Sequence, residues 1–238
     1  MKEKRIRLDF KKANDLSNGK LLSEKEFDKN EKLIAETSYS YYSDDISKDW
    51  IYKYENGRLV EKKWNSDNSS AERFVYEYDE QGKLIKELWF NKPMIFGIGY
   101  EDGSPIIKNY IYNNLGQLIE KISDHRDVGF YDKWVFEYDN NNIIREIGYN
   151  NSGDIQYENR FEYDENNNVI TKEVLIKGRV NNMFSFKYND NNQKISMKEH
   201  RQMMTETKYE YKNDMLISEY IYEYGQNVPK YIIKIVRE

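Results

Sequence analysis

The segment HRD at His125–Asp127 holds residue types that protein kinases use for catalysis, in which the aspartate acts as a base and a following asparagine holds metal. In this chain the asparagine position is Asp132, and neither a glycine-rich loop nor a strand lysine precedes the segment. The segment GIGYED from Gly97 lacks the third glycine and the following helix of a dinucleotide-binding motif. We therefore interpret both segments as solvated loops.

Metal chemistry has little support in the sequence. The chain has two histidines and no cysteine, so a zinc site would need carboxylates for most of its ligands. The turns DENNN and NDNN carry oxygen ligands, but they lack the alternating positions, the glycine and the final glutamate of a calcium loop. No spacing of carboxylates selects an acid and base pair. The sequence predicts no metal, no cofactor and no enzymatic activity.

Aromatic residues in one irregular segment are better candidates for binding, because binding residues concentrate on loops that a regular scaffold holds. The segment lies between Tyr78 and Tyr112, which are 34 residues apart. It combines large apolar side chains with prolines and glycines that interrupt strands. The candidate partner-binding residues are Trp89, Phe90, Phe96, Tyr100, Glu101 and Asp102. The alternative is that the segment folds back as a plug over an open end of a sheet.

The scaffold that must hold such loops is a repeat. Copies of one pattern, for example YEYDEQGKLIKE, begin at Lys25, Tyr52, Tyr76, Tyr110, Phe136, Phe161, Phe186 and Tyr209. Two aromatics separated by one residue lie on the same face of a strand, and the Asp, Asn and Gly that follow favour a turn. An aliphatic pair then begins a second strand. Each copy therefore predicts a β-hairpin.

The turns also predict how the two strands pair. A type I′ turn at Asn56-Gly57 places Tyr54 opposite Leu59, and a type I turn with a bulge at Gly82 places Tyr78 opposite Leu84. The same rule pairs Phe27 with Leu33, Tyr112 with Leu118, Tyr138 with Ile143, Tyr163 with Val169 and Tyr211 with Leu216. Only the hairpin with Tyr188 opposite Lys194 departs from it.

The second face of each hairpin should carry charged residues opposite aliphatic ones. We expect Glu77 opposite Ile85 and Glu137 opposite Ile144. The aromatic face should be the buried one, because a slip of one residue would bury these glutamates.

These features predict an all-β protein. We expect a meander of about eight tandem antiparallel β-hairpins that forms one twisted, curled or spiral sheet. Residues 1–238 should form a single repeat domain, with an N-terminal capping hairpin at 1–24, repeats at 25–220 and C-terminal capping strands at 221–238.

Composition limits the classes of partner. Hydrophobic residues make up 38% of the chain, and 22 tyrosines supply much of the surface that can be buried. The net charge of −5 argues against a nucleic-acid partner. No stretch is apolar enough to insert into a membrane, and the start MKEKRIRLDF lacks the apolar run of a signal peptide. We expect a cytoplasmic protein.

The copies YEYDEQGKL, YKYENGRL, YIYNNLGQL, FEYDNNNI and FEYDENNNV resemble the YD-repeat (RHS-repeat) family, whose unit reads Tyr-x-Tyr-Asp-x-x-Gly-Arg-Leu. The resemblance covers about residues 25–220. It implies an array of hairpins that winds as a spiral sheet and, in large members, forms a shell around a toxin. Without a recognisable cleavage segment or toxin domain, the chain resembles a short stand-alone member.

We therefore expect a non-catalytic module with a protein partner, of the immunity type that neutralises a cognate toxin. The toxin link comes from the family resemblance. The alternative is a carbohydrate-binding or cell-surface YD-repeat fragment, because rows of aromatic side chains also bind sugars.

Overall fold

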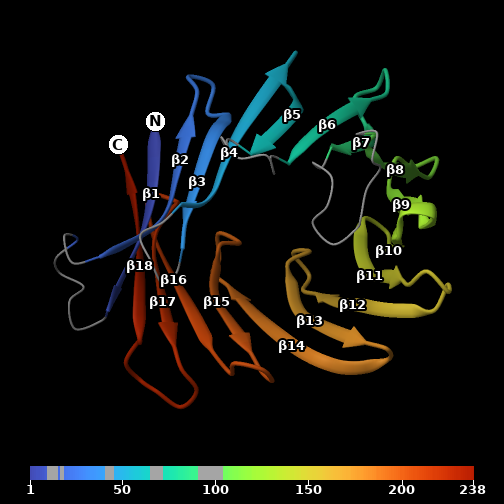
Figure 1. Ribbon diagram of the computed structural model, residues 1–238. Coiled ribbons are helices and arrows are strands. Elements are labelled where there is room, and N and C mark those ends of the chain that lie inside the picture. Colours follow the sequence, from blue (N-terminus) through green and yellow to red (C-terminus); the bar gives the residue numbers. More distant parts are fainter. Residues whose placement is uncertain (10–15, 17–18, 41–45, 65–71, 91–103) are drawn as a thin grey trace. The chain divides into compact units, whose positions relative to one another are not determined.

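The structure is a computed structural model that describes residues 1–9, 16, 19–40, 46–64, 72–90 and 104–238 (Figure 1). It is all-β, as the sequence predicts. The strands are β1 (Lys2–Asp9), β2 (Lys20–Phe27), β3 (Leu33–Tyr39), β4 (Ile46–Glu55), β5 (Arg58–Trp64), β6 (Arg73–Tyr78), β7 (Leu84–Phe90), β8 (Ile106–Tyr112), β9 (Leu118–His125), β10 (Phe130–Asp139), β11 (Asn142–Tyr149), β12 (Ile155–Tyr163), β13 (Val169–Ile176), β14 (Arg179–Tyr188), β15 (Lys194–Glu199), β16 (Glu206–Lys212), β17 (Met215–Tyr222) and β18 (Tyr231–Arg237). One 3-10 turn, η3 (Arg126–Val128), separates β9 from β10.

The sheet closes through its terminal strands. All 18 strands belong to one sheet, and β1 pairs antiparallel with both β2 and β18 (Figure 1). The backbones of Lys2 and Glu238 exchange two hydrogen bonds of 2.9 Å. The expected curled or spiral sheet of about eight hairpins is therefore wrong, because the 18 strands form a closed sheet. An open sheet leaves N–H and C=O groups unpaired at its two edge strands, whereas here the first and last strands satisfy each other.

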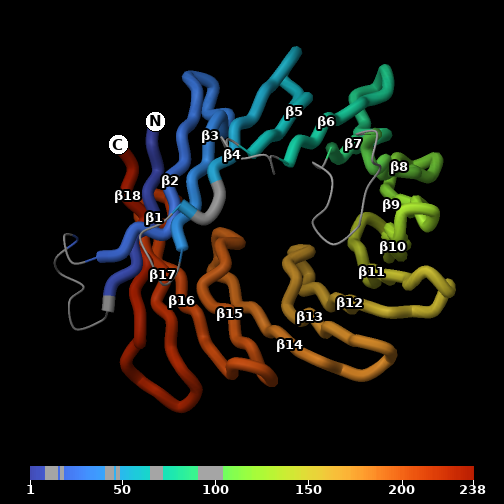
Figure 2. The backbone as a smooth tube through the Cα atoms, viewed as in Figure 1, coloured from blue at the N-terminus to red at the C-terminus, as the bar shows by residue number. Residues whose placement is uncertain are grey.

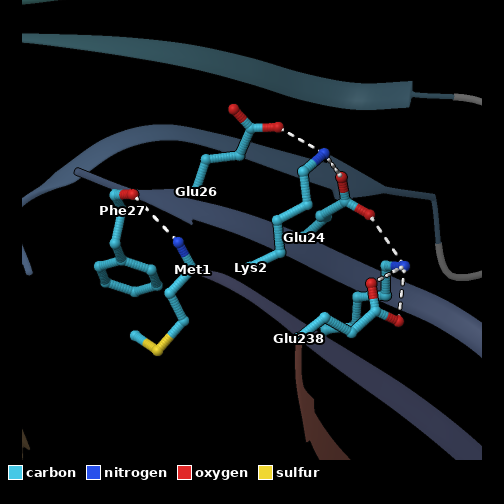
Figure 3. A network of polar contacts seen from close by, with 7 residues as sticks. Met1, Lys2, Glu24, Glu26, Phe27 and Glu238 are labelled. Atoms are coloured by element: carbon cyan, nitrogen blue, oxygen red, sulfur yellow. Dashed lines mark hydrogen bonds and ion pairs between the residues drawn. The ribbon is translucent and has the colours of Figure 1, made fainter. Parts of the chain in front are cut away.

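Charged side chains reinforce the contact between the termini (Figure 3). The ammonium of Lys2 lies 3.2 Å from Glu24 and 2.6 Å from Glu26 on β2. The ammonium of Lys4 lies 3.1 Å from the carboxylate of Glu238. These pairs are largely exposed, so we expect each to add little to the stability of the fold.

The strands fall into two compact units. The first comprises Met1–Lys48, Arg160–Leu175 and Arg179–Glu238, and the second comprises Asp49–Asn159 and Ile176–Gly178. Among the described residues, no helix is long and apolar enough to cross a membrane.

The turns adopt the predicted types. Asn56 and Gly57 have φ angles of 47° and 84°, and Tyr54 pairs with Leu59. Gly82 has a φ of 88°, and Tyr78 pairs with Leu84. The predicted pairing is also confirmed for Phe27 with Leu33, Tyr112 with Leu118, Tyr138 with Ile143, Tyr188 with Lys194 and Tyr211 with Leu216.

The first residue of the longer turns fixes their shape. In five turns its side-chain Oδ1 accepts hydrogen bonds from two backbone N–H groups of the turn, and these residues are Asp28, Asn113, Asn150, Asp164 and Asn189. Asparagine tolerates the left-handed conformation, so Asn167 and Asn192, with φ angles of 61° and 57°, can take the place that Gly82 holds in its own turn.

The predicted pairing on the second face is wrong by one residue. Glu77 pairs with Lys86 and Glu137 pairs with Arg145. The second strand of each hairpin has a bulge at this point, so Ile85 and Ile144 have no residue directly opposite them in the first strand. The shift gives Glu137 a cationic partner at 2.9 Å.

A tyrosine from each of several hairpins is tied to the hairpin before it. The hydroxyl donates a hydrogen bond to a backbone carbonyl at the start of the second strand of the preceding hairpin. In the second unit Tyr78 reaches Leu59, Tyr112 reaches Leu84 and Tyr138 reaches Leu118, over 2.7, 2.9 and 2.9 Å. In the first unit Tyr188 reaches Val169 and Tyr211 reaches Lys194, over 2.9 and 3.0 Å. The tyrosine rings are half-buried, and their hydroxyls link successive repeats.

Candidate functional site

Two connectors of the first unit border a cavity of about 560 Å³, which we call the loop cavity. The β15–β16 connector and the strand ends beside it contribute residues 198–200 and 204–206, and the end of β17 and the β17–β18 connector contribute residues 222–227. Glu206 pairs with Tyr222, so both connectors leave the sheet at the same end of β16 and β17 (Figure 2).

A buried amide holds the first connector in place. The side chain of Asn182 is 5% exposed, and its Nδ2 donates a 2.6 Å hydrogen bond to Oε1 of Glu199. The same oxygen accepts a hydrogen bond from the backbone N–H of Met203. The backbone N–H of Glu199 also donates to the carbonyl of Thr205. These contacts tie the β15–β16 connector to β14.

Large apolar side chains lie exposed on the two connectors. Met203 is 74% exposed, Met204 42%, Tyr224 77% and Val228 55%. We call these four residues the apolar rim. Single exposed apolar residues are normal on a protein surface, but a group of them beside a cavity is typical of an interaction site.

Acidic groups dominate the charge of the loop cavity. Its lining contains the carboxylates of Glu199, Glu206 and Glu223 and the ammonium of Lys198. Oε1 of Glu206 accepts a 3.0 Å hydrogen bond from Ser196, and Oε2 lies 3.7 Å from Lys198. The hydrogen bond from Lys230 to Glu223 raises the pKa of that lysine.

One residue of the cavity lining, His200, contacts a serine that does not line the cavity. Oγ of Ser185 lies 2.8 Å from Nε2 of His200. A hydrolytic triad needs a third group that orients the histidine, and among the described residues no carboxylate hydrogen-bonds to His200. The described residues also contain no group of three or more His, Asp or Glu placed to hold a metal ion.

A second cavity of about 380 Å³ lies at the turns of two neighbouring hairpins in the first unit. Several of its polar side chains are already engaged in hydrogen bonds. Asp164 accepts hydrogen bonds from its own turn, and Nδ2 of Asn168 donates to Asp164 and to Asn192. Such side chains have little remaining capacity to bind a sugar hydroxyl.

The structure describes two of the six predicted partner-binding residues. Trp89 stacks on Phe74 with ring centroids 6.0 Å apart and meets the edge of Phe130 at 5.8 Å, so it belongs to an aromatic cluster of the second unit. Phe90 lies under the guanidinium of Arg73 at 5.0 Å. The other four, Phe96, Tyr100, Glu101 and Asp102, lie outside the described residues.

Sequence reasoning missed the apolar rim. The adjacent Met203 and Met204, in a connector of otherwise polar residues, were the available signal. Tyr224 and Val228 gave none, because their segment also resembles the start of a capping strand.

Comparison with known proteins finds no family whose model matches and no curated protein that matches. Among solved structures, a porin-like protein from Bacteroides uniformis is similar in fold, with 9% identity and a TM-score of 0.51 over 100% of this chain and 97% of that chain. A TcdB2-TccC3-Cdc42 structure has 12% identity and a TM-score of 0.42, with 96% of this chain and 13% of that chain covered. A Photorhabdus luminescens Tc holotoxin pore has 13% identity and a TM-score of 0.43, with 92% and 11% covered. The chain thus spans a small part of the toxin-complex chains that it matches, and these scores assign it to no family.

Proposed function

We propose that the chain is a non-catalytic protein-binding module that holds its partner at the loop cavity and the apolar rim. The exposure of Met203 and Tyr224 beside this cavity is the observation that carries the proposal. Tyrosine and methionine are enriched in protein interfaces. The contact of Asn182 with Glu199 supports the proposal further, because a connector that is already ordered loses less entropy when a partner binds.

We further propose that the partner is a toxin and that the chain is its immunity protein in the cytoplasm. This part rests on the resemblance of repeats such as YEYDEQGKL to the YD-repeat family, of which we propose the chain is a short stand-alone member. The loop cavity supplies the binding surface, and the hairpin array supplies the rigid support for it.

Affinity capture tests the proposal. The immobilised full chain is exposed to lysate of the source cell, in parallel with the Met203→Ser/Tyr224→Ser double variant and with Leu115→Ser. Leu115 is 83% exposed in the β8–β9 turn of the second unit and serves as the matched control. We expect a protein that the chain and the control retain and the double variant loses. Expression of that protein alone should arrest growth, and co-expression of the chain should relieve the arrest.

Two results would count against it. Equal capture by the double variant would remove the rim from the binding surface. A captured protein that is harmless when expressed alone would leave the binding function in place but exclude the immunity role.

A further inference from the structure

We infer that Met203 and Met204 form an oxidation site that controls binding at the apolar rim. A peroxide converts their thioethers to sulfoxides, and the polar sulfoxides weaken the contact between the rim and its protein partner. This inference rests on the proposed function and adds its regulation. It follows from the exposure of the two side chains, from the backbone conformation of Met204 and from the chemistry of the thioether.

Both methionines are open to an oxidant. Met203 is 74% exposed and Met204 is 42% exposed, and Met204 also lines the loop cavity. Met183 in β14 and Met197 in β15 are only half-buried neighbours in the sheet, so they are reached less easily. The chain contains no cysteine, so no thiolate competes for the oxidant. Exposed methionines are therefore the side chains that a peroxide modifies first.

The backbone of Met204 indicates that the fold does not favour methionine at this position. Its φ angle is 49°, in the left-handed region that disfavours residues other than glycine and asparagine. The other described non-glycine residues with positive φ are asparagine, aspartate, glutamate or lysine, and Met204 is the one apolar residue among them. Backbone strain of this kind is found at functional sites. We therefore assign the methionine a role of its side chain and not of the turn.

The oxidation is a balanced reaction with hydrogen peroxide as the co-reactant. The lone pair of the thioether sulfur attacks one peroxide oxygen, an S–O bond forms and the O–O bond breaks. The sulfur loses two electrons to the peroxide. The proton of the transferred oxygen passes to the second oxygen, which leaves as water.

The product differs from the thioether in polarity. A sulfoxide accepts hydrogen bonds, so a partner that covers it must supply a donor or bury an unsatisfied oxygen. Reductases that act on methionine sulfoxide restore the thioether. Oxidation of Met203 and Met204 would thus release the partner reversibly.

A peptide without methionine provides the probe. It is selected from a displayed random library on the immobilised full chain, and peptides that also bind the Met203→Ser/Tyr224→Ser variant are discarded. The peptide is titrated into the untreated chain, into the chain after hydrogen peroxide has been applied and removed, and into the oxidised chain after treatment with methionine sulfoxide reductase. We expect the dissociation constant to rise about tenfold on oxidation and to return on reduction. Mass spectrometry of peptides measures the sulfoxide at each methionine.

Two variants locate the effect. Met215 is 51% exposed but lies outside the rim, so Met215→Leu should respond to peroxide as the wild type does. In the Met203→Leu/Met204→Leu double variant, the ratio of the dissociation constants after and before treatment should fall close to one.

The backbone argument has a separate test. Met204→Asn should raise the midpoint of thermal unfolding by about 2 °C, because asparagine tolerates the left-handed region. A lower midpoint would show that the fold requires methionine at this position and would count against the inference.

Three results would overturn the inference and leave the proposed function in place. They are equal affinity of the oxidised and untreated chains, failure of the reductase to restore binding, and a full response of the Met203→Leu/Met204→Leu variant to peroxide. Selection that yields only peptides that the Met203→Ser/Tyr224→Ser variant also binds would instead overturn the proposed function, and the inference with it.

Discussion

The hydroxyl of Tyr138 donates a 2.9 Å hydrogen bond to the backbone carbonyl of Leu118, which belongs to the preceding hairpin. We predict that Tyr138→Phe lowers the free energy of unfolding by about 1 kcal/mol, because the carbonyl loses its side-chain donor while the ring still packs. Urea unfolding of the two proteins measures the difference. Tyr224→Phe is the control, since Tyr224 is exposed and should lose nothing. Equal midpoints for all three proteins would show that the hydroxyl contacts between repeats are energetically neutral.

Arg145 should matter more than an ordinary surface cation. It donates to Glu137 and to Glu158, whose side chain is 6% exposed. We predict that Arg145→Met destabilises the fold by about 2 to 3 kcal/mol, because it removes a cation that pairs with a buried carboxylate. Arg126→Met, which breaks an exposed pair with Asp124, should destabilise the fold far less.

The double variant Arg145→Met/Glu158→Met should regain much of that stability. If it unfolds as readily as Arg145→Met alone, the loss comes from packing of the arginine stem and not from the stranded charge.

The turn at Gly82 requires a left-handed backbone, with a φ of 88°. We predict that Gly82→Ala destabilises the fold by about 1 kcal/mol through the strain that a Cβ adds at positive φ. Asn167 occupies the corresponding position of its own turn, and Asn167→Gly should change stability by only a few tenths of a kcal/mol. Thermal unfolding of the two variants compares them directly, and a greater loss for Asn167→Gly would contradict the assignment.

Buried tyrosines predict a loss of stability at alkaline pH. Burial, with a contribution from Glu87, raises the pKa of Tyr76 to about 12, and burial raises the pKa of Tyr209 to about 12. An unfolded tyrosine loses its proton near pH 10, so between about pH 10 and 12 the unfolded state binds fewer protons than the folded one. The free energy of unfolding should therefore fall as pH rises through this window. Tyr76→Phe should make the fall less steep, and an unchanged slope would refute the assignment to Tyr76.

Local pairing could be read from the sequence, and long-range closure could not. The pairing of Tyr78 with Leu84 follows from turn residues a few positions away, which dictate the turn type. The bulge at Ile85 could not be predicted, because the consecutive aliphatic residues Leu84 and Ile85 fit equally well in a regular strand whose side chains alternate between the two faces. The pairing of Arg5 with Ile235 joins strands outside the repeats, and nothing in either segment encodes its partner.

The candidate site was less accessible to sequence reasoning than the fold. Aromatic content pointed to Trp89, which packs in the aromatic cluster with Phe74. Exposure of Met203 depends on the path of a connector that Asn182 and Glu199 hold through tertiary contacts. Residue type alone does not distinguish a packed aromatic from an exposed one.

Methionine oxidation of the captured complex tests the binding surface most directly. Met203 is 74% exposed on the apolar rim, and Met215, 51% exposed at the start of β17, lies outside the rim and provides an internal control. Both residues should oxidise readily in the free chain treated with peroxide, as mass spectrometry of peptides can measure. In the complex, we predict that oxidation of Met203 slows several-fold while that of Met215 is unchanged. Equal oxidation of Met203 in the free and bound chain would contradict the assignment of the loop cavity and its rim as the partner-binding surface.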